Sequence, residues 1–335
     1  MLDINLIKTN PEYVKNALAK KGWEVDFTEL LAKVEKRVEL LKKIENVKAE
    51  ANKLSNSVPM VKKAGGDIQT IFAQVKALNA GIKEDEATLK ELENEINEFV
   101  CSLPNLPDND LVGGFKENNA VIYTFGNKPE FDFKAKDHVE LCESLGLIDY
   151  ERGAKISGHG TWIYTGLGAQ LEWALINFFI SEHLKDGYTM IMPPHLLNYE
   201  SGYTAGQFPK FADEVYWLDC DEDRKKNRFM LPTAETALVN LYAGEIIDND
   251  KLPMKFFAYT PCYRKEAGSY RAEERGMIRG HQFNKVEMVQ YTTKEGSDKA
   301  FEELVEKIVV TTSTTERILV IIDFFIVHFS LFLRY

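Results

Sequence analysis

Apolar residues recur every three or four positions between residues 27 and 99, and this heptad spacing limits the fold more than any other feature of the sequence. A first run starts at Phe27, a second starts at Ile68, and the segment 64–67 (AGGD) separates them. Two heptad helices joined by a tight turn describe an antiparallel coiled-coil hairpin. At ~1.5 Å per residue, each helix is about 45–50 Å long. Because such a hairpin has no second apolar face, we expect it to project from the body of the protein. The heptad positions are Phe27, Leu31, Val34, Val38, Leu41, Ile44, Val47, Ala51, Leu54 and Val58, then Ile68, Ile71, Val75, Leu78, Ile82, Leu89, Leu92, Ile96 and Phe99.

The residues that flank the hairpin carry signals for helix ends. Residues 1–25 predict a short helix with Asn10 as N-cap and Pro11 at its first position. Asp26, followed three residues later by Glu29, predicts a capping box where the hairpin begins. Pro and Asp in the stretch 103–108 (LPNLPD) cannot continue a helix, so we expect a linker there.

Charge is distributed unevenly over the two predicted helices. Residues 27–63 contain nine Lys or Arg and five Glu, whereas residues 68–100 contain three Lys and seven Asp or Glu. The favoured interpretation is that opposite charges pair across the hairpin. A second interpretation, that the basic helix also contacts a phosphate backbone, stays open.

Composition limits the class of protein and the cellular compartment that we expect. The chain has 335 residues, is 44% hydrophobic and 28% charged, and carries a net charge of −11. This charge argues against nucleic-acid binding by bulk charge, although local basic surfaces remain compatible with it. The four cysteines form no C-x-x-C pair, and the N-terminus has no secretory pattern. We therefore expect a soluble protein of the reducing cytoplasm.

The second half of the chain mixes short strands with helices. A strand is predicted at 161–164, an apolar helix at 169–184, and a strand at 188–192 that stops before Pro194. The helix is apolar nearly all round, which predicts burial in a core or an interface. A strand at 229–231 leads to Thr233, a predicted N-cap for a helix over 236–243. No P-loop and no dinucleotide-binding glycine pattern is present in the sequence, so those nucleotide-binding folds are excluded.

Residues 255–292 predict two strands joined by a long charged loop. Arg264 and Arg279 lie where strand meets loop, and the carboxylates of Glu266 and Glu287 follow them. Guanidinium groups held by rigid strands suit a phosphate-bearing substrate. A charged loop on an antiparallel hairpin is also common as plain solvated surface, and spacing alone does not separate the two interpretations.

The order of several motifs makes the chain resemble a seryl-tRNA synthetase of the bacterial or organellar type, which is a class II aminoacyl-tRNA synthetase. The resemblance covers residues 1 to about 308 and includes the hairpin and the linker SLPNLPD. The further motifs are TGLGAQLE, YTMIMPPHLLN, GQFPKF from Gly206, LPTAET from Leu231, YRKEAGS from Tyr263 and RGMIRGHQFNKVE ending at Glu287. The resemblance implies an α+β fold. It consists of an antiparallel helical arm (1–105) followed by a class II domain (106–308), an antiparallel sheet flanked by helices.

The resemblance also implies site residues. Arg264 would be catalytic and would contact the ATP α-phosphate and the serine carboxylate. Glu266 would recognise the adenine amino group, and Phe283 would stack on the adenine ring. Pro194, at the end of class II motif 1, would belong to a homodimer interface. The implied serine-binding residues are Thr233, Ala234, Glu235, Arg264 and Glu287, and the implied ATP-binding residues are Arg264, Lys265, Glu266, Arg279, Gly280, His281, Gln282 and Phe283.

The implied reaction is ATP-dependent activation of L-serine to seryl-adenylate, then transfer of the seryl group to tRNA(Ser), and also to tRNA(Sec). Neither step needs an enzyme nucleophile, because positioning and charge neutralisation carry such chemistry. By resemblance the arm binds the long variable arm of the tRNA through shape and backbone. Mg²⁺ is implied as the metal that accompanies ATP.

The family pattern stops after residue 308, where the third motif is expected. That region would supply the acidic Mg²⁺ ligands and an arginine for the γ-phosphate, so no metal ligand is identified. Residues 309–335 instead form an atypical tail, apolar from Ile318 to Leu333, which at about 16 residues is shorter than the ~20 needed to span a bilayer. We therefore expect no membrane association, an end that arises from truncation or a frame shift, and a poorly active chain. A catalytically inactive relative that binds tRNA or dimerises is the alternative. An amino acid:carrier-protein ligase is disfavoured because such proteins lack the long hairpin.

Overall fold

The computed structural model describes residues 2–124, 130–266 and 276–318, with residues 309–318 as backbone only. The chain divides into two compact units, one of residues Met1–Ala120 and one that begins at Val121. In the described ranges, no helix is long and apolar enough to cross a membrane. The predicted tail beyond residue 318, and the loop residues 267–275, lie outside these ranges.

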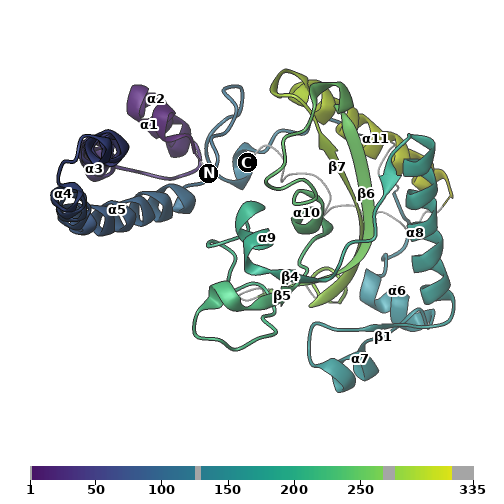
Figure 1. The fold of residues 1–335 in the computed structure, drawn as a ribbon. Coiled ribbons are helices and arrows are strands. Elements are labelled where there is room, and N and C mark those ends of the chain that lie inside the picture. Colours follow the sequence, from purple (N-terminus) through teal and green to yellow (C-terminus); the bar gives the residue numbers. More distant parts are fainter. Residues whose placement is uncertain (1, 125–129, 267–275, 319–335) are drawn as a thin grey trace. The chain divides into compact units, whose positions relative to one another are not determined.

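The first unit contains the predicted helical hairpin (Figure 1). Helix α3 (Thr28–Lys63) has 36 residues, which gives a length of about 54 Å. The returning helix is divided into α4 (Ile68–Gly81) and α5 (Lys83–Ser102). The break at Ile82 follows Gly81, whose residue type weakens a helix, while the Ile82 side chain stays buried. The hairpin expectation is confirmed, with this interruption added.

The base of the arm is a small apolar core. Helices α1 (Ile4–Thr9) and α2 (Pro11–Ala19) meet at Asn10, whose side chain accepts a hydrogen bond from the Tyr13 N–H at 3.3 Å. The predicted cap and the position of Pro11 are therefore confirmed. The fully or nearly fully buried side chains of this core come from α1, α2, α3 and α5: Ile7, Val14, Leu18, Phe27, Leu30, Val34, Leu92, Ile96 and Val100.

The predicted capping box at Asp26 is wrong. The Asp26 carboxylate accepts from the Thr28 N–H at 3.0 Å and from the Thr28 hydroxyl at 2.7 Å, and the helix begins at Thr28. Glu29 forms an ion pair with Lys33 at 2.8 Å, one turn into the helix. Because a competing local turn satisfies Asp26, the reciprocal bonds of a capping box do not form.

Opposite charges do pair across the hairpin, but only along part of its length. Every cross-helix ion pair of the described arm joins α3 to an acidic residue of α5, and α4 contains no Asp or Glu. These pairs are Lys33–Glu95 at 3.0 Å, Arg37–Glu93 at 2.8 Å, Lys43–Asp85 at 2.7 Å and Lys48–Glu86 at 2.6 Å. Among the described residues, the exposed Lys53, Lys62 and Lys63 have no such partner.

The second unit is organised around a three-stranded sheet in the order β3–β6–β7 (Figure 1). Strands β6 (Met254–Tyr263) and β7 (Gln282–Tyr291) form the predicted antiparallel pair, with Ala258 opposite Glu287. The short strand β3 (Thr189–Met190) pairs with β6 in the parallel sense. The predicted antiparallel pairing is confirmed for β6 and β7, and within this sheet only the short β3 is parallel to its neighbour.

Helices cover both faces of this sheet. Phe257, Val286 and Met288 pack on one face against Ile176 of α8 (Leu167–Lys185) and Leu304 of α11 (Ser297–Ile318). On the opposite face, Ala258 packs against Ala234 and Leu238 of α10 (Ala234–Leu238). Successive residues of a strand point to opposite faces, so the alternation of β6 and β7 produces the three layers.

Smaller elements complete the second unit. Strand β1 (Ile148–Asp149) pairs with β2 (Ile163–Tyr164), and β4 (Leu196–Asn198) pairs with β5 (Arg228–Met230). Helix α6 (His138–Ser144) precedes β1, α7 (Tyr150–Ser157) lies between β1 and β2 in the sequence, and α9 (Tyr199–Thr204) lies between β4 and β5. Helix α8 is not buried all round, because Leu167, Trp173 and Leu184 are exposed in the single chain.

Candidate active site

The candidate site lies on the α10 face of the β6–β7 pair. Phe283, Lys285 and Glu287 alternate along β7 and therefore point to the same face. Across the pair, Lys285 lies opposite Thr260, and Phe283 lies opposite Cys262. Both partners on β6 are fully buried, so this part of the sheet forms a rigid floor.

Thr233, at the N-cap of α10, joins this floor to the helix. Its hydroxyl donates to Glu287 Oε2 at 2.6 Å, and the Glu235 backbone N–H donates to the same oxygen at 2.8 Å. The Glu235 N–H also lies 3.3 Å from the Thr233 hydroxyl oxygen, which is the N-cap bond predicted from the sequence. Ala234 is completely buried between these two residues. The predicted serine-binding residues Thr233, Glu235 and Glu287 are thus brought together.

Lys285 completes this cluster and was missed by the sequence analysis. Its Nζ lies 2.6 Å from the Thr233 hydroxyl oxygen and 2.9 Å from each oxygen of the Glu287 carboxylate. A lysine two residues before a candidate carboxylate on a strand points to the same face as that carboxylate. The alternation of β7 could therefore have identified Lys285.

The Glu235 side chain differs from that of Glu287. Within the described residues, the Glu235 carboxylate accepts no hydrogen bond from another side chain. Burial raises its pKa, and the negative charge of Glu287 raises it further, whereas Lys285 and Arg264 lower it. Glu235 is therefore a partly buried carboxylate that a ligand cation could pair with.

Arg264 extends from the end of β6 toward the same face. Its Nε donates to the Pro232 carbonyl at 3.1 Å, and its guanidinium carbon lies 5.1 Å from the centre of the Phe283 ring. The backbone of Arg264 is fixed as well, because its N–H donates to the His281 carbonyl at 3.0 Å. The terminal nitrogens have no partner among the described residues, so they are available to an anionic group.

The predicted ATP-binding residues beyond the strands form a second group. Arg279 Nη1 lies 3.1 Å from Glu266 Oε2, and Glu266 has a positive φ of 47°. This left-handed backbone is uncommon for a residue other than glycine. The Lys265 N–H donates to the Glu214 carbonyl at 2.8 Å, which ties the start of the loop to a neighbouring segment.

Gly280 and His281 are held by the segment 158–162. The His281 N–H donates to the Gly160 carbonyl at 3.0 Å, and a Cβ on Gly280 would lie 2.2 Å from the Trp162 ring. Only glycine lets the indole approach the backbone this closely. Gln282 is exposed, and so is Pro194, the predicted dimer-interface residue.

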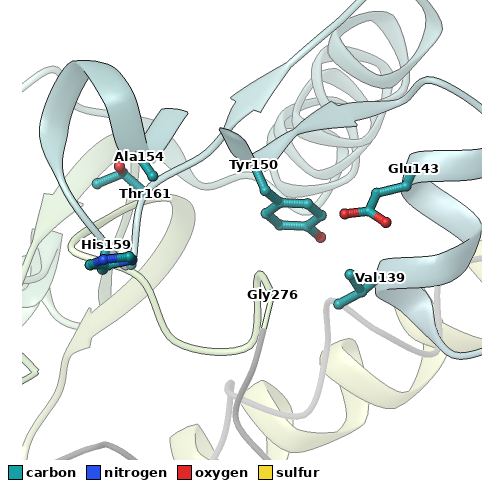
Figure 2. Close-up of a pocket in the computed structure, with 8 residues that line it drawn as sticks. Val139, Glu143, Tyr150, Ala154, His159, Thr161 and Gly276 are labelled. Atoms are coloured by element: carbon teal, nitrogen blue, oxygen red, sulfur yellow. The ribbon is translucent and has the colours of Figure 1, made fainter. Parts of the chain in front are cut away.

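A cavity of about 260 Å³ is lined in part by His159 and Thr161 of this segment (Figure 2). The Tyr150 ring lies between Glu143 and Val139 of α6 and the loop that carries His159 and Thr161 (Figure 2). None of the predicted serine- or ATP-binding residues lines this cavity. In the described ranges, no cluster of three or more His, Cys, Asp or Glu side chains is arranged to hold a metal ion.

Comparison with known protein families identifies the class of this fold. Residues 216–319 match the tRNA synthetase class II core domain (G, H, P, S and T), so the second unit is that of a class II aminoacyl-tRNA synthetase. Residues 1–107 match the seryl-tRNA synthetase N-terminal domain. Serine–tRNA ligase 2 of Clostridium acetobutylicum is 54% identical over 308 residues, which cover 92% of this chain and 72% of that protein. The serine–tRNA ligase of Thermodesulfovibrio yellowstonii is 39% identical over 308 residues, covering 91% of this chain and 72% of that protein. The chain belongs to the seryl-tRNA synthetase family.

Solved structures agree with this assignment. The seryl-tRNA synthetase of Pyrococcus horikoshii complexed with ATP matches with a TM-score of 0.77 and 29% identity, covering 92% of this chain and 73% of that chain. The cytoplasmic serine–tRNA ligase of Naegleria fowleri in complex with AMP matches with a TM-score of 0.75 at 21% identity, covering 92% of this chain and 75% of that chain, and supports the fold. The resemblance derived from sequence motifs, and the α+β fold that it implied, are confirmed.

Proposed function

We propose that the chain is built to activate L-serine with ATP and to transfer the seryl group to tRNA(Ser), and also to tRNA(Sec). The observation that carries this proposal is the cluster of Thr233, Lys285 and Glu287 beside the Glu235 carboxylate, which accepts no hydrogen bond from any other described side chain. Such a site suits a small substrate with an ammonium group and a hydroxyl group. The family membership and the ATP-bound relative support the same activity.

Different residues bind the different polar groups of serine. The Glu235 carboxylate binds the serine ammonium group, because no other side chain among the described residues donates a hydrogen bond to it. The Thr233 and Glu287 groups lie within hydrogen-bonding distance of each other and present oxygens to the serine hydroxyl. A substrate that lacks the hydroxyl forms no hydrogen bond with these oxygens and therefore binds more weakly. Ala234, which we also assign to the serine subsite, is buried beside Leu238 and Ala258.

Arg264 bridges the two reacting groups. A carboxylate oxygen of serine attacks the α-phosphorus of ATP, the bond from this phosphorus to the bridging oxygen breaks, and pyrophosphate leaves with the bond electrons. A guanidinium group that contacts both the carboxylate and the α-phosphate holds them together and balances the developing charge. In the second step a ribose hydroxyl of the tRNA attacks the seryl carbonyl carbon, and AMP leaves.

The adenine and the phosphates are assigned to the remaining predicted residues. Phe283 lies under the Arg264 guanidinium and offers its ring to the adenine, and Glu266 accepts from the adenine amino group. Lys265, Arg279, Gly280, His281 and Gln282 lie along the nucleotide. Mg²⁺ is expected with ATP, but the described residues include no cluster of three or more His, Cys, Asp or Glu that could hold a metal ion.

The helical arm is proposed to bind the tRNA. Lys53, Lys62 and Lys63 are exposed near the tip and lack ion-pair partners among the described residues, so they are free to contact a phosphate backbone. We propose residues 1–105 as this arm and residues 106–308 as the catalytic domain, with residues 309–335 in place of the third-motif region. The exposed side chains of α8 and of Pro194 support a homodimer. The cytoplasmic location and the poor activity of this chain stay predictions.

Calorimetry with a non-hydrolysable seryl-adenylate, the sulfamoyl analogue, tests the proposal. We expect the alanyl analogue to bind about 10-fold more weakly or worse, because it forms no hydrogen bond with the Thr233 and Glu287 oxygens. Equal binding of the two analogues would reject the serine assignment. Serine-dependent exchange of pyrophosphate into ATP then separates an active chain from an inactive tRNA-binding relative, and near-normal exchange would contradict the predicted impairment.

A further inference from the structure

We propose that Lys285 is a positioning residue for serine recognition, because its ammonium group locks Glu287 against Thr233 and thereby leaves Glu235 as the carboxylate that receives the substrate. This inference rests on the proposed function and adds a residue that the family resemblance did not assign. We expect Lys285 to affect the serine subsite and not the nucleotide subsite around Phe283.

The hydrogen bonds of the cluster form a closed set. Glu287 Oε2 accepts from the Thr233 hydroxyl and from the Glu235 N–H, and Lys285 Nζ lies 2.9 Å from both carboxylate oxygens. The Thr233 hydroxyl oxygen in turn accepts from Lys285 at 2.6 Å. The Lys285 and Glu287 side chains are only 14% and 15% exposed, so water does not replace these bonds easily.

Removing the ammonium group would alter the substrate site in a specific way. Glu287 would lose its only paired cation among the described residues, and the Thr233 oxygen would lose a donor. Two carboxylates, Glu235 and Glu287, would then share one partly buried site with Arg264 as the nearby cation. Like charges in such a site favour protonation of one member or rotation away from the other. In either case the geometry that receives the serine ammonium and hydroxyl groups is lost.

A merely structural ion pair is the competing explanation, and the same sheet offers a matched control. Lys255 of β6 forms an ion pair with Glu303 of α11, with side-chain exposures of 24% and 33%. This pair, like Lys285–Glu287, joins a lysine of the sheet to a glutamate. Lys255 lies opposite Gln290, however, and Phe283 lies at the other end of the β6–β7 pair. Lys255→Met therefore reports the cost of breaking an ion pair without touching the proposed subsite.

Calorimetry on the full 335-residue chain compares the wild type with Lys285→Met and Lys255→Met. The probes are the seryl sulfamoyl analogue and AMP. We expect Lys285→Met to weaken seryl-analogue binding by about 10- to 100-fold, which is the range expected for the loss of a hydrogen bond to a charged group. AMP binding should be unchanged, and Lys255→Met should change neither affinity.

Every other outcome contradicts either the positioning role of Lys285 or the proposed function. Unchanged seryl-analogue binding in Lys285→Met, or an equal loss of AMP binding, overturns the positioning role. A wild-type chain that binds neither probe rejects the proposed function itself. If Lys285→Met does not fold, Lys285→Gln, which keeps polar donors but no charge, must show the same serine-specific loss. In the ligand-free chain, amide exchange at Glu235 should accelerate in the Lys285 variant and not in the Lys255 variant, and equal rates would contradict the proposal.

Discussion

Replacement of Arg264 by glutamine removes the cation that we assign to the reacting phosphate and carboxylate. In the structure this side chain is anchored through Nε to the Pro232 carbonyl at 3.1 Å and lies 5.1 Å above Phe283. The anchor leaves the terminal nitrogens without a partner among the described residues, so their binding energy is available to a ligand. We therefore expect the variant to keep its fold and to bind ATP more weakly.

The magnitude follows from the contacts. A hydrogen bond to a charged group contributes about 1.5–3 kcal/mol, which corresponds to about 10- to 150-fold in Kd. Arg264→Lys keeps the charge but loses the planar fork and the contact with Phe283, so its loss should be nearly as large. A lysine that restored wild-type binding would mean that charge alone matters.

The assay is calorimetric titration of ATP into each variant, with the melting temperature measured alongside. Arg228→Gln is the control, because Arg228 forms an exposed ion pair with Asp219 at 3.0 Å and belongs to no proposed site. The reasoning is refuted if Arg264→Gln binds ATP as tightly as the Arg228 control while its melting temperature is unchanged.

Three further changes have expected outcomes. Gly280→Ala places a Cβ 2.2 Å from the Trp162 ring, so we expect a lower melting temperature and weaker ATP binding by calorimetry. Glu235→Gln should raise stability at neutral pH, because the folded-state pKa of Glu235 is raised and its ionised form is disfavoured. The gain should vanish as pH falls below the unfolded value of about 4.3, measured as melting temperature against pH. Lys62→Ala with Lys63→Ala should weaken tRNA(Ser) binding and lower the salt dependence of log K by about 2 in slope or less.

Controls for these changes come from the same chain. Gly81→Ala, where a Cβ meets no atom within 4 Å, should leave ATP binding intact, so a loss there would point to general damage. A pH-independent effect of Glu235→Gln would contradict the ionisation cause. Lys43→Ala, which removes a lysine already paired with Asp85 at 2.7 Å, should cost less tRNA affinity than the tip variants. An equal cost would favour a diffuse charge effect over contact at the tip.

Local patterns predicted much of the fold. The strands β6 and β7 match the predicted hairpin closely, because long alternating runs of apolar residues leave only one register that buries them. Thr233 was predicted as an N-cap from its residue type and its place before the helix, and the structure confirms it. The predicted helix over 236–243 was displaced, since α10 already ends at Leu238. There the Asn240 side chain donates to the Ser201 and Thr236 carbonyls, which competes with helical bonding.

The site was harder to predict because its contacts join distant segments. Thr233 and Glu287 are far apart in the sequence, and only the covering of β7 by α10 brings their oxygens within 2.6 Å. Spacing alone left the charged hairpin open between a phosphate site and plain surface. The motif order supplied the candidate residues, but it did not mark Lys285. The alternation of β7 is enough to place Lys285 on the same face as Glu287, whereas its contact with Thr233 joins segments that are distant in the sequence.

The interruption at Ile82 has a mechanical consequence for the arm. Ion pairs and a shared apolar core hold α3 and α5 together. The remaining part of α3 packs against the shorter α4, which contains no acidic residue. We therefore expect the α3–α5 part of the hairpin to be stiffer than the α3–α4 part, with α3 running continuously through both. We expect thermal fluctuations to grow along α3 from the part that packs against α5 toward the part that packs against α4.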